Sequence, residues 1–191
     1  MTTTPEVTGV LARLDAGDAT ALDELLPLVY EELRTLARRQ RRRLGAAETM
    51  NTTGLVHEVY LKLVGSERIT ATGRAHFFAL AARAMRQVLS NNARARRAAR
   101  RGGGLAPVAL DLVDELVGID QSAHTDTLVA LDDALTALSR LSARQSRVVE
   151  CRFYAGMSVA ETALALGVSE PTVKRDWAVA QAWLYRELKS A

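Results

Sequence analysis

Helix-capping signals and a glycine turn determine how the C-terminal part of the chain can fold. In each signal a serine precedes the helix and is followed by residues favoured in the first helical turn: Ser142 with Gln145, Ser158 with Glu161, and Ser169 with Glu170 and Pro171. The serine oxygen can accept a hydrogen bond from a backbone N–H that has no partner inside the helix. The signals predict helices over residues 143–155, 159–166 and 170–189.

The segment between the last two predicted helices is a short turn. Gly167 can adopt a positive φ angle there, and Val168 can fill the angle between the two helices. Ala163, four residues before the glycine, is small enough to let the helices cross closely. This pattern predicts a helix-turn-helix, the motif that places its second helix in the major groove of DNA.

The last predicted helix has one buried side and one exposed side. At about 100° per residue, these apolar residues share the buried side: Val173, Trp177, Ala180, Leu184 and Leu188. Thr172, Lys174, Arg175 and Ala178 lie mostly opposite them, near the end that a recognition helix inserts into the groove. Lysine and arginine suit phosphates or guanine edges, and threonine and alanine suit a thymine methyl group. We therefore predict that these four residues contact DNA.

The N-terminal part of the chain is also predicted to be helical. Alanine, leucine, arginine and glutamate are abundant, and aromatic residues make up only 5% of the sequence, which favours helices over sheets. Apolar residues recur at helical spacing over residues 19–44, 52–65 and 74–101. Asp18 can cap the first of these helices, and Pro27 inside it predicts either a kink or the start of another helix. We expect an all-α protein.

The predicted helix over residues 74–101 carries charge of one sign, with eight arginines and no acid. A helix kept only for solubility normally mixes signs to form pairs three and four residues apart, whereas this helix repels itself unless an anion lies against it. We therefore predict that it contacts nucleic acid. The predicted contact residues are Arg83, Arg86, Asn91, Arg94 and Arg97.

Charge is also segregated along the whole chain. Residues 1–103 carry 17 basic and 10 acidic residues, residues 104–139 carry no base and seven acids, and residues 140–191 carry eight bases and five acids. Arginine and lysine clusters attract a phosphate backbone because binding releases its counterions. Two basic parts on either side of an acidic strip therefore indicate two separate contacts with a polyanion.

Three successive glycines, residues 102–104, mark a hinge after the basic helix, because glycine makes continued helix costly. We predict two small helical domains, residues 1–101 and 128–191, of which the second holds the helix-turn-helix. An acidic flexible linker over residues 102–127 is expected to join them.

The sequence has no pattern typical of an enzyme or of a metal site. His57, His76 and His124 are scattered, Cys151 is the single cysteine, and no glycine-rich phosphate loop is present. We expect no catalytic residue, no metal and no cofactor. No apolar run approaches the roughly 20 residues that span a bilayer, and the N-terminal residues lack the pattern of a signal peptide. We expect no membrane contact and a cytoplasmic protein.

Three ordered segments resemble one subgroup of the short, two-domain sigma factors of the extracytoplasmic-function (ECF) group, in the sigma-70 family. They are GLVHEVYLKL at residues 54–63, AHFFALAARAMR at 75–86 and TVKRDWAVAQAWL at 172–184. The resemblance extends from about residue 18 to residue 189. It implies a bacterial factor that binds core RNA polymerase and directs promoter recognition and transcription initiation, with promoter DNA as its second partner and an anti-sigma factor as a candidate third.

The resemblance also assigns a role to each predicted part. The helix around residues 54–64 would bind the clamp of the polymerase, the arginine-rich helix the start-proximal promoter element, and the C-terminal domain the upstream element. The acidic linker would imitate the charge of the transcript whose channel it occupies. The predicted polymerase contacts are His57, Glu58, Leu61 and Lys62. Leu61 is apolar although it lies off the buried stripe, as expected if a partner covers it. Asp176 stands where many relatives outside this subgroup have a base, which predicts a less cationic recognition side.

The chief alternative is a repressor or activator that binds duplex DNA without polymerase through its helix-turn-helix. Such a regulator normally has a ligand pocket, a phosphoacceptor domain or a dimerisation helix. The N-terminal part of this chain offers an arginine-rich helical bundle instead. The sequence therefore favours the sigma factor.

Overall fold

The structure is a computed structural model that describes residues 4–18, 20–43, 51–64, 73–99 and 124–190. Eight α-helices and a short π-helical segment account for nearly all of these residues, and none of them lies in a strand. The prediction of an all-α protein is confirmed. The predicted glycine hinge and most of the predicted linker lie outside the described residues.

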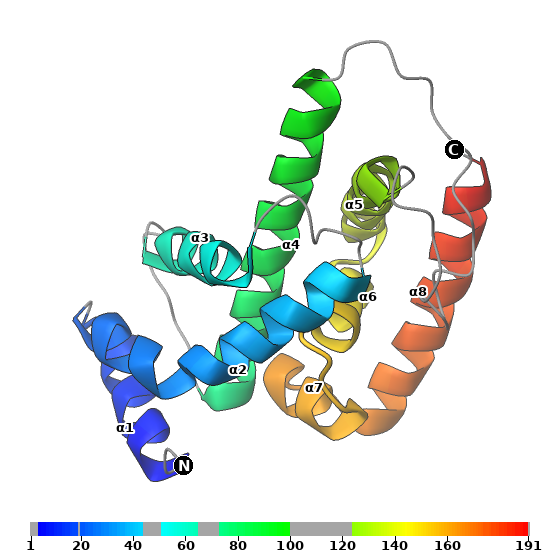
Figure 1. The fold of residues 1–191 in the computed structure, drawn as a ribbon. Helices are drawn as coiled ribbons and strands as arrows, with labels where there is room; N and C mark the ends of the chain where they lie inside the picture. The colour runs from blue at the N-terminus through cyan, green and yellow to red at the C-terminus, as the bar shows by residue number, and fades with distance from the viewer. Residues whose placement is uncertain (1–3, 19, 44–50, 65–72, 100–123, 191) are drawn as a thin grey trace.

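The helices follow one another along the chain in two groups. The N-terminal group is α1 (Thr4–Asp15), α2 (Ala21–Arg43), α3 (Thr52–Val64) and α4 (Arg74–Ala99). The C-terminal group is α5 (His124–Leu141), α6 (Ala143–Val149), the π-helical segment η2 (Glu150–Tyr154), α7 (Val159–Leu166) and α8 (Glu170–Ser190). Helices α5 and α6 lie between the long helices α4 and α8 (Figure 1).

The start of α2 follows the predicted cap. Asp18 accepts a hydrogen bond from the backbone N–H of Thr20 at 3.0 Å and another from its hydroxyl at 2.6 Å. These bonds and the Arg13 guanidinium lower the pKa of Asp18 to about 2. Pro27 lies inside α2, which continues as a single helix, so no second helix begins there. Helix α1, which the sequence did not predict, buries Val7 in the hydrophobic core that α2 also contributes to.

The C-terminal helices follow the capping signals closely. Ser142 accepts a hydrogen bond from the N–H of Gln145 at 3.3 Å, and Ser158 and Glu161 form a reciprocal capping box. The predicted helix over residues 143–155 is divided, because its second half winds as the π-helical segment. Gly167 ends α7 with φ 63°, the left-handed conformation that the turn requires.

The two groups of helices share one hydrophobic core. Helix α4 packs against α5, η2 and α7, so Phe77 and Met85 of the N-terminal group belong to the same buried cluster as Leu135 and Tyr154. Helix α5 begins at His124, inside the segment predicted as linker. The described residues therefore form one packed body rather than two parts joined only through a linker.

A buried ion cluster lies at the centre of this joint. The Arg86 side chain of α4 donates hydrogen bonds of 2.8 Å to Asp132 of α5 and 2.8 Å to Glu150 of η2. It donates two more, of 3.0 Å each, to the Asp132 carbonyl and the Thr136 hydroxyl. Burial opposes the charged guanidinium, but the bond to Glu150 and the two carboxylate charges outweigh it and raise the pKa of Arg86. The charged groups of the cluster thus have hydrogen-bond partners, as buried charges require.

A second polar contact joins α2 to the end of η2. The buried amide nitrogen of Gln40 donates to the carbonyl oxygens of Phe153 at 2.9 Å and Tyr154 at 2.7 Å. Beyond it, Gly156 adopts φ 68°, and a side-chain carbon at this position would approach a guanidinium nitrogen of Arg39 to 2.2 Å. The backbone at Gly156 therefore lies close to the Arg39 side chain of α2.

Replacing Gly167 and Gly9 by alanine should have opposite effects on the free energy of unfolding. Gly167→Ala should lower the free energy of unfolding by about 1–2 kcal/mol, because alanine is strained in the left-handed conformation. Gly9→Ala, inside α1 with open space around the new carbon, should raise it by about 0.5–1 kcal/mol. Urea denaturation measures both. Equal effects of the two substitutions would contradict the turn geometry.

Removing the arginine of the buried cluster should strongly destabilise the protein. Arg86→Met leaves the Asp132 and Glu150 carboxylates without their shared cation, and breaking a buried pair in this way costs about 3–5 kcal/mol. The exposed Arg83 on the same helix is the matched control, and Arg83→Met should change the free energy of unfolding by less than about 0.5 kcal/mol. Similar denaturation midpoints for both variants would show that the cluster does not hold the joint.

Candidate nucleic-acid interface

The N-terminal half of α8 presents the predicted DNA contacts to solvent. Lys174, Arg175 and Ala178 are exposed and Thr172 is partly exposed, while Val173 is fully buried in a small cluster with α6 and α7. Ser169 accepts a hydrogen bond from the Thr172 N–H at 3.4 Å, and the two hydroxyls lie 2.9 Å apart. The turn and cap thus fix the start of α8, and its two cations project away from the core.

Asp176 lies on the opposite side of α8 from the one predicted. Only 2% of the residue is exposed, and its carboxylate accepts hydrogen bonds of 2.5 Å and 3.2 Å from Arg144 of α6. The prediction that Asp176 makes the recognition side less cationic is therefore wrong. The pair ties α8 to α6, and the bond to Asp176 raises the pKa of Arg144.

Trp177 is half-buried and packs as the sequence suggested. The guanidinium carbon of Arg152 lies 5.5 Å from the centre of its ring, a cation–π contact on the inner side of α8. The tryptophan ring therefore packs on the inner side of α8 and does not belong to its exposed side.

The predicted contacts on α4 fall into two sets. Arg83 and Asn91 are exposed, with no ion pair to any described residue. Arg86 is buried in the ion cluster, Arg94 pairs with Asp132 at 2.7 Å and with Asp133 at 2.5 Å, and Arg97 lies 3.5 Å from Asp126. The hydrogen bond to Asp132 raises the pKa of Arg94. In this conformation three of the four predicted arginines face acids of α5.

The predicted polymerase contacts share one exposed side of α3. His57, Glu58 and Lys62 are exposed, and Leu61 is 47% exposed. Four apolar residues of the helix are buried on the other side: Leu55, Val56, Val59 and Leu63. Val64, the last residue of the helix, is 50% exposed. The structure thus brings the four candidate residues together on a surface that no described part of the chain covers.

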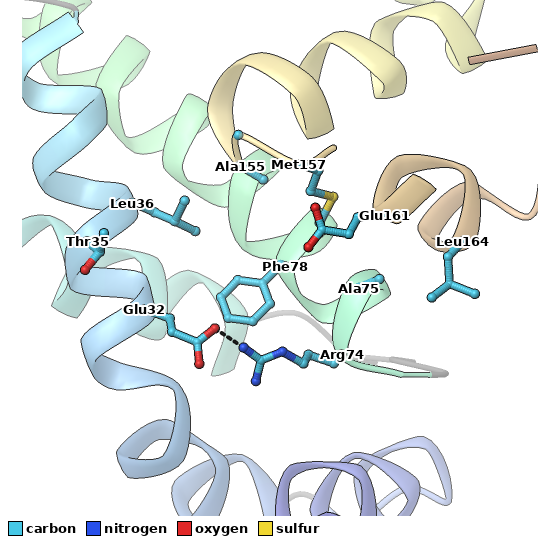
Figure 2. Close-up of a pocket in the computed structure, with 11 residues that line it drawn as sticks. Glu32, Thr35, Leu36, Arg74, Ala75, Phe78, Ala155, Met157, Glu161 and Leu164 are labelled. Carbon is cyan, nitrogen blue, oxygen red and sulfur yellow. Dashed lines mark hydrogen bonds and ion pairs between the residues drawn. The ribbon is translucent and has the colours of Figure 1, made fainter. Parts of the chain in front are cut away.

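A cavity of about 560 Å³ lies between α2, the start of α4 and the segment from η2 to α7. Figure 2 shows Phe78 and Leu36 in its wall, with Met157 and Leu164 contributed by the C-terminal group. Glu32 and Arg74 form an ion pair at its edge. The sequence could not predict this cavity, because it exists only where the two groups of helices meet.

The acids that face the arginines of α4 were also missed as partners. Asp126, Asp132 and Asp133 belong to the acidic strip over residues 104–139, of which the predicted linker contained Asp126 and the predicted C-terminal domain contained Asp132 and Asp133. The absence of basic residues from the strip was the available signal. Within the described residues no group of His, Cys, Asp and Glu side chains is placed to hold a metal ion. None of the described helices combines the length and apolar character of a membrane span.

The comparison with protein families gives a match over almost the whole chain. The model described as "ECF sigma factor" matches residues 4–190. No curated protein and no solved structure matches the chain significantly. The matched range includes α3, the arginine helix α4 and the exposed side of α8. The chain therefore belongs to the ECF sigma factor family, whose members act in transcription initiation and are not enzymes.

Proposed function

We propose that this chain binds core RNA polymerase and directs it to promoters through two separate DNA contacts. Residues of α4 contact the start-proximal element, and the N-terminal half of α8 contacts the upstream element. The observation that carries the proposal is the exposed pair Lys174 and Arg175 at the N-terminal end of a capped helix, opposite a fully buried Val173. That arrangement suits insertion into a major groove.

The two groups of helices make different contacts in this proposal. We assign the polymerase contact and the start-proximal contact to residues 1–101, and the upstream contact to the C-terminal helices from α5 onward. An acidic linker between them would let the two contacts separate on a long promoter. A cytoplasmic location follows from the proposed partners, since polymerase and DNA are both there.

A test with and without core polymerase separates this proposal from the alternative of a repressor or activator that acts alone. A sigma factor should bind a promoter fragment weakly by itself and tightly and selectively once the polymerase is added. A stand-alone regulator should reach full affinity without the polymerase. Anisotropy of a labelled promoter fragment, measured with both mixtures at one fixed salt concentration, distinguishes the two functions.

Leu61→Asp should lower the affinity for core polymerase by at least about tenfold, because it replaces the one apolar side chain among the four proposed contacts with a charge. The side chain is half-exposed, so the variant should unfold at nearly the same temperature as the wild type. Leu61→Met, which keeps the apolar surface, is the control and should bind normally. A folded Leu61→Asp variant with unchanged polymerase affinity would show that the polymerase binds elsewhere.

Substitutions at Arg175 and Lys174 should have different effects on upstream recognition. Arg175→Ala should change the ranking of upstream sequences, since a bidentate arginine–guanine contact discriminates by about 1–3 kcal/mol. Lys174→Ala should weaken binding to all upstream sequences evenly. It should also reduce the slope of log affinity against log salt concentration by about one unit. The measurement is transcription from a panel of upstream variants with reconstituted polymerase at two salt concentrations.

Lys189→Ala is the matched control for this panel, because Lys189 is exposed at the far end of α8 and stacks over Tyr185. It should leave both ranking and strength unchanged. If Arg175→Ala also kept the wild-type ranking and strength, α8 would not read the upstream element.

A further inference from the structure

A second cavity, of about 480 Å³, lies between α4, α5, α6 and the start of η2. These elements are neighbours in the fold, with α5 packed against both α4 and α6 (Figure 1). Apart from Ala143, every described residue that lines this cavity is polar or charged, and we call it the polar cavity. Its volume falls within the range of about 300–1,000 Å³ that is typical of small-molecule sites.

The polar cavity has an excess of positive charge. Its lining has four arginines against one aspartate and one glutamate, which gives a net charge of +2. Arg86 and Arg94 are paired with these two acids in the buried cluster. The excess therefore comes from the other two arginines, Arg83 of α4 and Arg147 of α6, which are both exposed.

Arg83 and Arg147 line the same cavity from different helices and can bind one anion together. Neither forms an ion pair with any described residue. Arg147 donates from Nε to the Ala143 carbonyl at 3.3 Å, which leaves its two terminal nitrogens to meet other acceptors. A guanidinium binds phosphate oxygens through parallel hydrogen bonds. A phosphate monoester carries a charge of about −1.5 to −2 near pH 7, so it would neutralise the excess.

Uncharged polar groups occupy the remainder of the lining. The Thr136 hydroxyl accepts a hydrogen bond from Arg86 at 3.0 Å, so its own proton remains available as a donor. The Ser139 hydroxyl donates to the Thr136 carbonyl at 2.7 Å, so its oxygen remains available as an acceptor. The side-chain amides of Gln87 and Asn91 can both donate and accept. These groups match the hydroxyls of a sugar, whereas no described aromatic side chain lines the cavity to stack on a nucleobase.

Much of this lining is already held in place. The Arg86 side chain makes four hydrogen bonds, and Arg94 donates to the Ser90 hydroxyl at 3.3 Å. The Ser146 hydroxyl donates to the Leu135 carbonyl at 3.4 Å. A site whose side chains are already ordered loses less free energy when it binds a ligand.

We infer that the polar cavity is a binding site for a small sugar phosphate. Arg83 and Arg147 hold the phosphate group, and Gln87, Asn91 and Thr136 hydrogen-bond the hydroxyls. The inference goes beyond the proposed function and does not depend on it, because the site belongs to the free chain. The ligand contacts α4, α5 and α6 at once, so it stabilises the folded chain as its concentration rises.

The test is titration calorimetry of the full chain with glucose 6-phosphate and with ribose 5-phosphate. Glucose, ribose and inorganic phosphate are the reference ligands, since each has only one of the two kinds of group. Arg83→Gln with Arg147→Gln removes both cations of the proposed site. The matched control is Arg38→Gln with Arg140→Gln, two exposed arginines outside the cavity that change the net charge equally. Thermal unfolding of each protein is measured with and without ligand.

We expect the wild type and the control to bind one equivalent of at least one of the two sugar phosphates. The affinity should exceed that for each reference ligand by at least about tenfold, because the phosphate and hydroxyl contacts act together. The cavity variant should lose at least about tenfold in affinity. Without ligand it should unfold at nearly the same temperature as the control, since both changed side chains are exposed.

Three results would overturn the inference. In the first, neither sugar phosphate binds more tightly than inorganic phosphate. In the second, the cavity variant binds the sugar phosphate as tightly as the control does. In the third, a short DNA duplex binds through Arg83 and Arg147 and neither sugar phosphate competes with it, which would assign these arginines to nucleic acid. None of these results would contradict the proposed function, which is tested separately with polymerase and promoter DNA.

Discussion

The fold depends on one arginine held between two carboxylates. Arg86 lies where α4, α5 and η2 meet, and the three charged groups are nearly inaccessible to water. Two charges taken from water require close geometry and full hydrogen bonding to be stable together. The position of α5 against α4 is therefore specified far more narrowly than apolar packing alone would specify it. Arg94, which also contacts Asp132, brings the charges of this group into balance.

Contacts of different strength surround this centre. The apolar core across the joint supplies most of the free energy, since each large side chain removed from water contributes about 1.5–3 kcal/mol. The exposed pairs of Arg94 and Arg97 contribute about 0–1 kcal/mol each, so they adjust the joint rather than hold it. The interface therefore has a specific buried centre and an edge that adds little to its stability.

Local signals in the sequence predicted local structure well. The serines at positions 142, 158 and 169 and the glycine at 167 determine the C-terminal helices, because caps and turns involve only neighbouring residues. The exposed side of α8 followed from helical periodicity. Asp176 was misplaced because the comparison with relatives that have a base there assigned it to the recognition side, although its angle on the helix puts it near Val173. The joint was missed because its partners lie 46 and 64 residues apart, and no periodicity connects such positions.

The way α2 holds the end of η2 bears on how this joint could diverge among related chains. The Gln40 amide donates hydrogen bonds to two backbone carbonyls. Backbone acceptors are present whatever the side chains at these positions are. Substitution at position 153, which is only half-buried, would leave the contact unchanged. Position 156 has less freedom, because a residue with a side-chain carbon is strained at its φ of 68°. Sequence drift here is therefore freest at position 153, since Tyr154, Ala155 and Met157 are buried in the shared core.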